Sequence, residues 1–195
     1  ESVRAEAKIF IIAFLRAVKA GKEFMFRSAA AVTKVIGAVS DRPLLTKEEL
    51  IASDNSNGGI VLVGSHVNKT TMQLEELKNC KYPIEFIEFN AHLVKEDGAL
   101  EREVERVIGL VENFIKAGKR ISGYTSRQLV QLETTDKDKI LEASVKVSDA
   151  LTNIVGRLTV KPTFIIAKGG ITSSDVGTKA LRVKKANVMG QINHG

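Results

Sequence analysis

The sequence predicts an α/β fold, a three-layer sandwich in which helices cover both faces of a mostly parallel sheet. Short runs rich in β-branched residues alternate along the chain with longer segments whose apolar residues recur every three or four positions. Of the 195 residues, 44% are apolar, which suffices for a substantial core, but only 5% are aromatic and Trp is absent. Aliphatic side chains must therefore fill that core, as they do in many layered α/β proteins.

The first predicted element is a helix over residues 3–20, a segment that is rich in Ala and lacks Gly and Pro. Gly21 follows and is well placed to end this helix. Residues 9–15 are apolar on nearly every side of the helix, so the segment is either a central core helix or the interface to a neighbouring domain. The sequence leaves both interpretations open.

Four strands are predicted from short runs, of which the β-branched run at residues 60–63 has the pattern of a strand that is buried on both faces of a sheet and the run at residues 121–124 is the weakest. The first run follows Gly58 and Gly59, and the loop before it, residues 53–59, is rich in Asn, Ser and Gly. The predicted strands are residues 60–63, 83–89, 121–124 and 162–167.

Helical patterns lie between and after these strands. Apolar residues at three- and four-residue spacing predict helices over residues 100–115 and 140–158. Two shorter helices, over residues 70–79 and 173–181, are predicted directly after strand-plus-loop segments. The chain shows no internal repeat and no interdomain linker, so we expect one domain over residues 1–195.

The charge distribution argues against a nucleic-acid partner. The net charge is +6, but Lys and Arg are scattered among Asp and Glu, and no basic run is interleaved with aromatic residues. The single cysteine, Cys80, suits a reducing compartment, and the longest apolar run, residues 9–15, is too short to span a bilayer. We therefore expect a cytoplasmic protein that binds neither nucleic acid nor membrane.

The most informative segment for function is the glycine-rich turn that follows the last predicted strand. In open α/β sheets, ligands bind beyond the carboxyl ends of the strands, where loops lead into helix N-termini. Adjacent Gly169 and Gly170 allow a close backbone approach to a phosphate, and Thr172 and Ser173 add hydroxyl groups. The alternative is a structural strand-to-helix turn, capped by Ser or Thr, in which Asp175 complements the helix dipole.

Two further loops follow predicted strands. Ser65 follows the strand 60–63 and either donates to a phosphate or ribose or caps a turn, whereas His66 is interpreted as a structural histidine. The residue before Lys69 is Asn68 rather than the glycine of a P-loop, which argues against a Walker-type site. Arg127, after the third strand, offers a permanently charged guanidinium either to phosphate oxygens or to a structural ion pair.

Other chemistries lack their sequence patterns. The chain contains no GxGxxG, HExxH or GxSxG motif. His66, His92 and His194 do not have metal-ligand spacing, so no metal-binding residue is predicted from the histidines. Hydrolase and zinc-enzyme functions are therefore not expected.

Taken together, these segments resemble the C-terminal half of the four-carbon acid-sugar kinase family. The resemblance depends on an ordered set of short motifs, which is more specific than any one of them. The motifs comprise Gly21-Lys22, residues 26–30, Arg42 to Thr46, Val63 to Val67, Thr70 to Leu74, Thr125 to Arg127, Lys168 to Asp175 and Gly190 to Ile192.

The resemblance implies the nucleotide-binding part of a two-domain kinase that transfers the γ-phosphate of ATP to a hydroxyl of a threonate-, erythronate- or oxo-tetronate-type sugar acid. It assigns nucleotide contacts to Ser65, Gly169, Gly170, Thr172 and Ser173, with Arg127 as an additional phosphate contact. Mg²⁺ is the expected cofactor, for which Asp175 and Ser65 are the nearest candidates.

The family's acid-sugar pocket lies in an N-terminal domain for which this sequence shows no segment, and its last glycine-rich loop follows Gly190 to Ile192 beyond the present sequence. We therefore expect a fragment that is inactive by itself, with the catalytic residues unassigned. A homo-oligomer is compatible with the sequence. The alternative function is a non-catalytic α/β module that binds another phosphorylated metabolite or a protein partner.

Overall fold

The computed structural model describes residues 2–51 and 55–193. The chain divides into two compact units, one of Glu1–Thr46 with Met189–Gly195 and one of Lys47–Val188. The expected loop at residues 53–59 lies partly outside the described residues, and its described part, residues 55–59, contains no regular element. The single domain over residues 1–195 stays a prediction.

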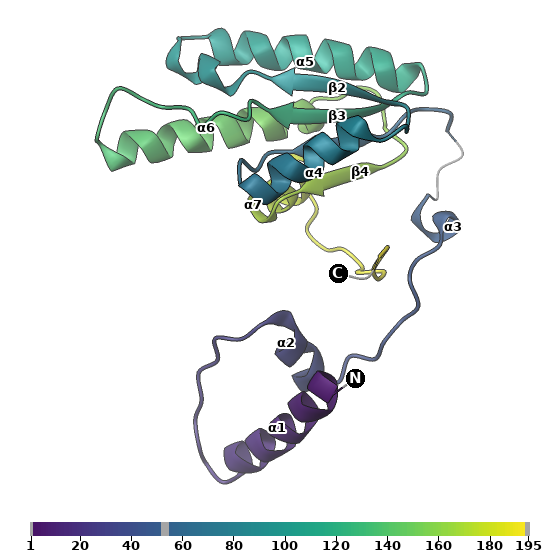
Figure 1. The fold of residues 1–195 in the computed structure, drawn as a ribbon, viewed down its shortest axis with the longest axis vertical. Helices are drawn as coiled ribbons and strands as arrows, with labels where there is room; N and C mark the ends of the chain where they lie inside the picture. Colours follow the sequence, from purple (N-terminus) through teal and green to yellow (C-terminus); the bar gives the residue numbers. More distant parts are fainter. Residues whose placement is uncertain (1, 52–54, 194–195) are drawn as a thin grey trace. The chain divides into compact units, whose positions relative to one another are not determined.

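The larger unit contains a four-stranded sheet in which every pairing is parallel. Its strands are β1 (Ile60–Val63), β2 (Ile84–Phe89), β3 (Arg120–Thr125) and β4 (Ile165–Lys168), in the order β2-β3-β1-β4. All four predicted strands are confirmed. The parallel register requires a crossover between successive strands, and helices supply these crossovers (Figure 1).

Three long helices of this unit match the predicted ones, namely α4 (Asn68–Asn79), α5 (Ala99–Lys116) and α6 (Lys137–Gly156). The helix predicted over residues 173–181 begins earlier and is not uniform, because α7 (Gly170–Asp175) continues into a π-helical turn, η2 (Val176–Ala180). The sequence patterns did not predict three short helices, α2 (Ala30–Ile36), α3 (Lys47–Leu50) and the 3₁₀ helix η1 (Ala91–Lys95).

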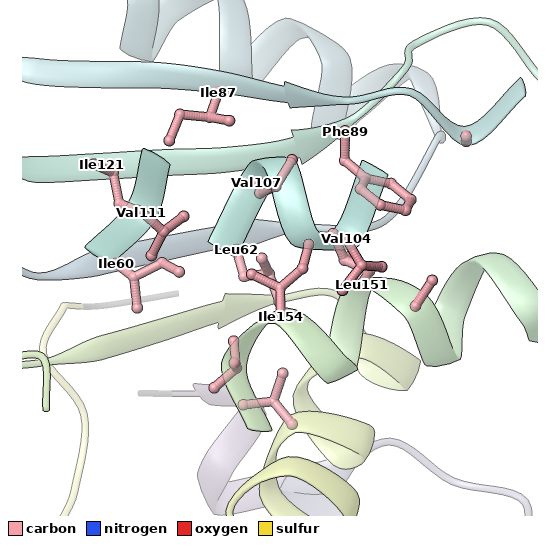
Figure 2. Close-up of a cluster of buried hydrophobic side chains, with 14 of the residues drawn as sticks. Ile60, Leu62, Ile87, Phe89, Val104, Val107, Val111, Ile121, Leu151 and Ile154 are labelled. Atoms are coloured by element: carbon pink, nitrogen blue, oxygen red, sulfur yellow. The ribbon is translucent and has the colours of Figure 1, made fainter. Parts of the chain in front are cut away.

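The hydrophobic core lies mainly between the sheet and helices α5 and α6. Alternate residues of the strands, among them Ile60, Leu62 and Ile121, point into this layer and meet Val107 and Ile154 from the two helices (Figure 2). On the opposite face, Leu74 of α4 packs with Val63 and Tyr124 in a smaller cluster. Helices thus cover both faces of the sheet, which confirms the predicted α/β fold with flanking helices.

The smaller unit contains α1 (Ser2–Lys19), which confirms the predicted N-terminal helix. The helix ends with two capping bonds, from the Gly21 amide to the Val18 carbonyl and from the Lys22 amide to the Ala17 carbonyl. Within residues 9–15, Ile11 is buried, whereas four large apolar side chains are exposed: Ile9, Phe10, Ile12 and Leu15. Within the smaller unit, most of this apolar segment is therefore not covered. None of the described helices is both long and apolar enough to cross a membrane.

The core between the sheet and α6 predicts a large difference between two substitutions on that helix. Ile154→Ala removes three carbons from a side chain that is 1% exposed, whereas Leu141→Ala removes three carbons from one that is 63% exposed. We expect Ile154→Ala to lower the free energy of unfolding by about 2–5 kcal/mol and Leu141→Ala by under about 1 kcal/mol. Urea unfolding followed by circular dichroism measures both values, and equal losses would contradict this placement of the core.

Candidate functional site

The loops that follow β1, β3 and β4 meet at the carboxyl edge of the sheet. A Cβ built on Gly169 would lie 3.5 Å from Cβ of Ser65, and the Arg127 guanidinium donates a hydrogen bond of 2.5 Å to the Ser65 carbonyl. These three residues were predicted as separate candidates. The structure brings them together in one site, and their contacts with a ligand remain predictions.

The first turn of α7 packs directly against the loop after β1. A Cβ on Gly64 would lie only 2.4 Å from Oγ1 of Thr172 and 3.0 Å from Cδ2 of Leu151. Thr172 is buried in this contact. Only glycine at position 64 allows α7 to lie so close to β1, so this contact sets the distance between the Ser65 loop and the glycine-rich turn.

The glycine-rich turn itself leaves backbone amides available. Gly169 has a φ of 114°, which favours glycine, and no side chain caps the N-terminus of α7. The Ser173 hydroxyl donates to the Gly170 carbonyl at 3.1 Å, so the helix backbone already engages it. A Cβ on Gly170 would meet no atom within 4 Å, which leaves room for a ligand against the backbone.

A cavity of about 510 Å³ opens beside these loops and has two chemically different walls. One wall is polar and consists of the Ser65 loop and the glycine-rich turn. The other is largely apolar and comes from residues 140–149 of α6, from the segment after Arg127 and from one residue of α7, and the charged side chains Asp149, Asp175 and Lys179 also line the cavity. Its apolar side chains are Leu129, Val130, Leu132, Ile140, Leu141, Val145, Val147 and Ile171.

The sequence does not predict that the residues of this apolar wall belong to a binding site. Several of its side chains, among them Leu129, Leu141 and Ile171, are more than half exposed. In the sequence, residues 140 and 141 belong to an ordinary amphipathic helix pattern, so only the folded structure identifies them as part of the cavity lining.

Arg127 braces two elements of the site. Its Nη2 donates to the Ser65 carbonyl and, at 2.9 Å, to the Thr71 hydroxyl in the first turn of α4. Burial lowers the pKa of Arg127, against the opposing charges of Glu75 and Glu88, but the guanidinium remains charged at neutral pH. Among the described residues Arg127 forms no ion pair, so the structural ion pair considered from the sequence is absent there.

His66 is a polar side chain of the site that lacks a partner at one nitrogen. Its Nδ1 is buried and forms no hydrogen bond with the described residues. Burial and, second, the nearby Arg127 charge hold the pKa of His66 below its usual value, while the Ser126 backbone acts in the opposite direction. The imidazole is therefore neutral at pH 7 and does not add a positive charge to the cavity.

Asp175, one of the residues considered for Mg²⁺, is engaged within the protein. Its Oδ2 accepts hydrogen bonds from the Ser148 hydroxyl at 3.3 Å and from the Lys179 ammonium at 3.2 Å. Within residues 2–51 and 55–193, no group of three or more His, Cys, Asp or Glu residues is arranged to hold a metal ion. Asp175 thus links α6, α7 and η2, and contacts of Asp175 and Ser65 with Mg²⁺ stay predictions.

The Gly64–Thr172 contact predicts a specific rescue. Gly64→Ala places a methyl group against Thr172 Oγ1, so we expect a loss of about 1–3 kcal/mol in the free energy of unfolding. In a Thr172→Ala background the loss should be smaller, because the contacting atoms are removed. Gly170→Ala, which meets no atom, serves as the control and should not lower stability. A Gly64→Ala loss that is the same in both backgrounds would contradict the contact.

The environment of His66 predicts its titration. We expect an NMR titration midpoint below 6.5, and Arg127→Gln should raise this pKa but leave it below 6.5, because burial is the larger cause. Because folding lowers the pKa of His66, the neutral imidazole contributes to the free energy of unfolding above pH 6.5. This contribution is lost as the pH falls through the folded-state pKa. Arg102→Gln on α5 serves as the charge control, and a midpoint at or above 6.5 in the unmodified chain would contradict the burial of the imidazole.

Most of the chain matches a known family of protein domains. Residues 60–195 match the family model of the nucleotide-binding C-terminal domain, whereas no curated protein and no solved structure matches the chain. The matched region begins at the first residue of β1 and includes every residue that lines the cavity. The resembling motifs at Gly21-Lys22, residues 26–30 and Arg42 to Thr46 lie outside it. The chain therefore belongs to the four-carbon acid-sugar kinase family and contains its nucleotide-binding C-terminal domain.

Proposed function

We propose that this chain is the ATP-binding part of a kinase that phosphorylates a hydroxyl of a four-carbon sugar acid of the threonate, erythronate or oxo-tetronate type. The observation that carries the proposal is the two-walled cavity at the carboxyl edge of the sheet. A nucleotide has the same division of chemistry, with a flat base that is buried favourably against apolar side chains and a polyphosphate that needs hydrogen-bond donors.

The apolar wall would receive the adenine base. Leu141 of α6 and Ile171 of α7 both line the cavity and are exposed, at 63% and 74%. Exposed aliphatic side chains that converge on one cavity gain free energy when a ligand removes them from water. The polar lining residues Ser144 and Ser148 already use their hydroxyls within the protein, so contact with the base would be mainly apolar.

The polar wall would receive the phosphates. Gly169 and Gly170 let oxygen atoms approach the backbone amides at the start of α7, and Ser65 lies directly beside this turn. Buried Thr172 would act by positioning the turn, and so would Ser173, whose amide donates to the Gly169 carbonyl at 2.9 Å and whose hydroxyl donates to the Gly170 carbonyl. Arg127 would act mainly by fixing the Ser65 loop, with its positive charge favouring the bound phosphates.

Phosphoryl transfer depends on positioning and on neutralising charge more than on covalent chemistry. The residues of this chain would hold the nucleotide, orient its phosphates and exclude water from the base. ATP would enter as its Mg²⁺ complex, with the cation held by phosphate oxygens and water. The sugar acid, with the hydroxyl that accepts the phosphate, would bind to the other domain of the family's two-domain kinase.

Calorimetric titration with ATP and ADP in the presence of Mg²⁺ tests this proposal. The chain should bind both nucleotides, and Gly170→Asp should weaken ATP binding at least about tenfold, because it adds a carboxylate beside the phosphates. Gly170→Asn has nearly the same size without the charge and should weaken binding less, and Gly170→Ala should bind nearly as the unmodified chain does, since it meets no neighbouring atom.

Two outcomes would overturn the assignment of the site. One is no binding of either nucleotide, and the other is binding that Gly170→Asp leaves unchanged. Binding of a different phosphorylated metabolite in place of ATP would instead support the alternative of a non-catalytic module.

A further inference from the structure

Lys168, the last residue of β4, has an unusual environment for a half-buried lysine. Its Nζ donates a 2.9 Å hydrogen bond to the hydroxyl of Thr70, a buried residue of α4. It forms no ion pair within residues 2–51 and 55–193. Other lysines of this unit do, such as Lys119 with Glu85 at 2.8 Å and Lys179 with Asp149 at 2.7 Å.

The position of Lys168 follows from the parallel sheet. Lys168 is paired with Val63 at the carboxyl end of β1, and it directly precedes the Gly169 turn. The side chains of Ile165 and Ala167 pack against the core with α5 and α6. Because side chains alternate along a strand, Lys168 points to the opposite face, where α4 lies. Its ammonium therefore lies on the α4 face of the sheet, and Lys168 is not among the residues that line the cavity.

A second cation without a carboxylate partner lies nearby. Arg127 donates to Thr71 and Lys168 donates to Thr70, so the two positive side chains bind neighbouring hydroxyls of α4. Both cations are partly buried and donate to neutral hydroxyls here, and Glu75 and Glu88 act on the Arg127 charge without forming an ion pair with it. An anion bound beside Ser65 would lower the energy of both.

We propose that Lys168 binds the terminal phosphate of the nucleotide, so that the site distinguishes a nucleoside triphosphate from a monophosphate. This inference rests on the proposed function. A nucleotide with its base on the apolar wall and its first phosphate at the Gly169 turn extends its remaining phosphates past Ser65 toward Lys168. In the unliganded chain Thr70 holds the ammonium in place, and the phosphate adds the missing negative charge.

The structure favours Lys168 over the lysine that the sequence places closest to a P-loop position. Lys69 immediately precedes Thr70 on α4, but its side chain is exposed. Lys69→Met removes the same charge from the same region as Lys168→Met. It is therefore a matched control for the long-range effect of one positive charge on phosphate binding.

Calorimetric titrations of AMP and ATP at constant Mg²⁺, on the full chain, test the inference. Lys168→Met should weaken ATP binding about 10- to 100-fold, as expected for the loss of a charge-assisted hydrogen bond, and should change AMP binding less than about threefold. Lys168→Arg should recover part of the ATP affinity, because it retains the charge. Lys69→Met should change ATP binding less than about threefold.

The outcomes separate this inference from the proposed function. If the unmodified chain binds no nucleotide, the proposed function fails, and this inference fails with it. If that chain binds ATP and Lys168→Met weakens AMP and ATP equally, or Lys69→Met weakens ATP as much as Lys168→Met does, the role of Lys168 is wrong while the ATP site stands. Urea unfolding midpoints of the variants show whether a loss of binding reflects a loss of the fold.

Discussion

The parallel pairing of β1 with β3 on one side and β4 on the other is the constraint on which the site depends. Val63 lies opposite Tyr124 and Lys168, so all three strands reach the carboxyl edge of the sheet at the same level. The loops that leave them must therefore begin side by side. The Gly64–Thr172 contact then fixes the distance between two of these loops, and the Arg127 guanidinium links the third to the first.

The sheet could be predicted from the sequence because its signal is local. Residues 60–63 form the apolar run that a buried parallel strand needs, and the runs at residues 83–89 and 162–167 are also rich in apolar residues, whereas residues 121–124 have a weaker pattern. The glycine-rich turn could be found for the same reason, since Gly169 and Gly170 directly follow a strand. The short helices α2 and α3 and the π-helical turn η2 have weak local patterns, and tertiary contacts determine where they form.

The rest of the site depends on contacts between residues that are distant in the sequence. The Lys168–Thr70 bond joins residues 98 positions apart, and no spacing rule connects them. The sequence suggested two roles for Arg127, a phosphate contact or an ion pair. It did not suggest the hydrogen bonds that the structure shows, from the Arg127 guanidinium to the Ser65 carbonyl and the Thr71 hydroxyl, which are both neutral. For residues 9–15, composition could not show which apolar side chains would be covered, and of the large apolar side chains in this segment Ile11 is the one that is buried.

Helix α6 has two halves with separate tasks. Its second half, from Val147 to Val155, supplies most of its buried residues and holds the helix on the sheet. Its first half, which includes Ile140, Leu141 and Val145, is largely exposed and supplies most of the cavity lining that comes from this helix. Substitutions in the first half can therefore alter the cavity at little cost in stability, and under the proposed function they would alter the choice of ligand. Ligand preference and fold are free to diverge at different rates along one helix.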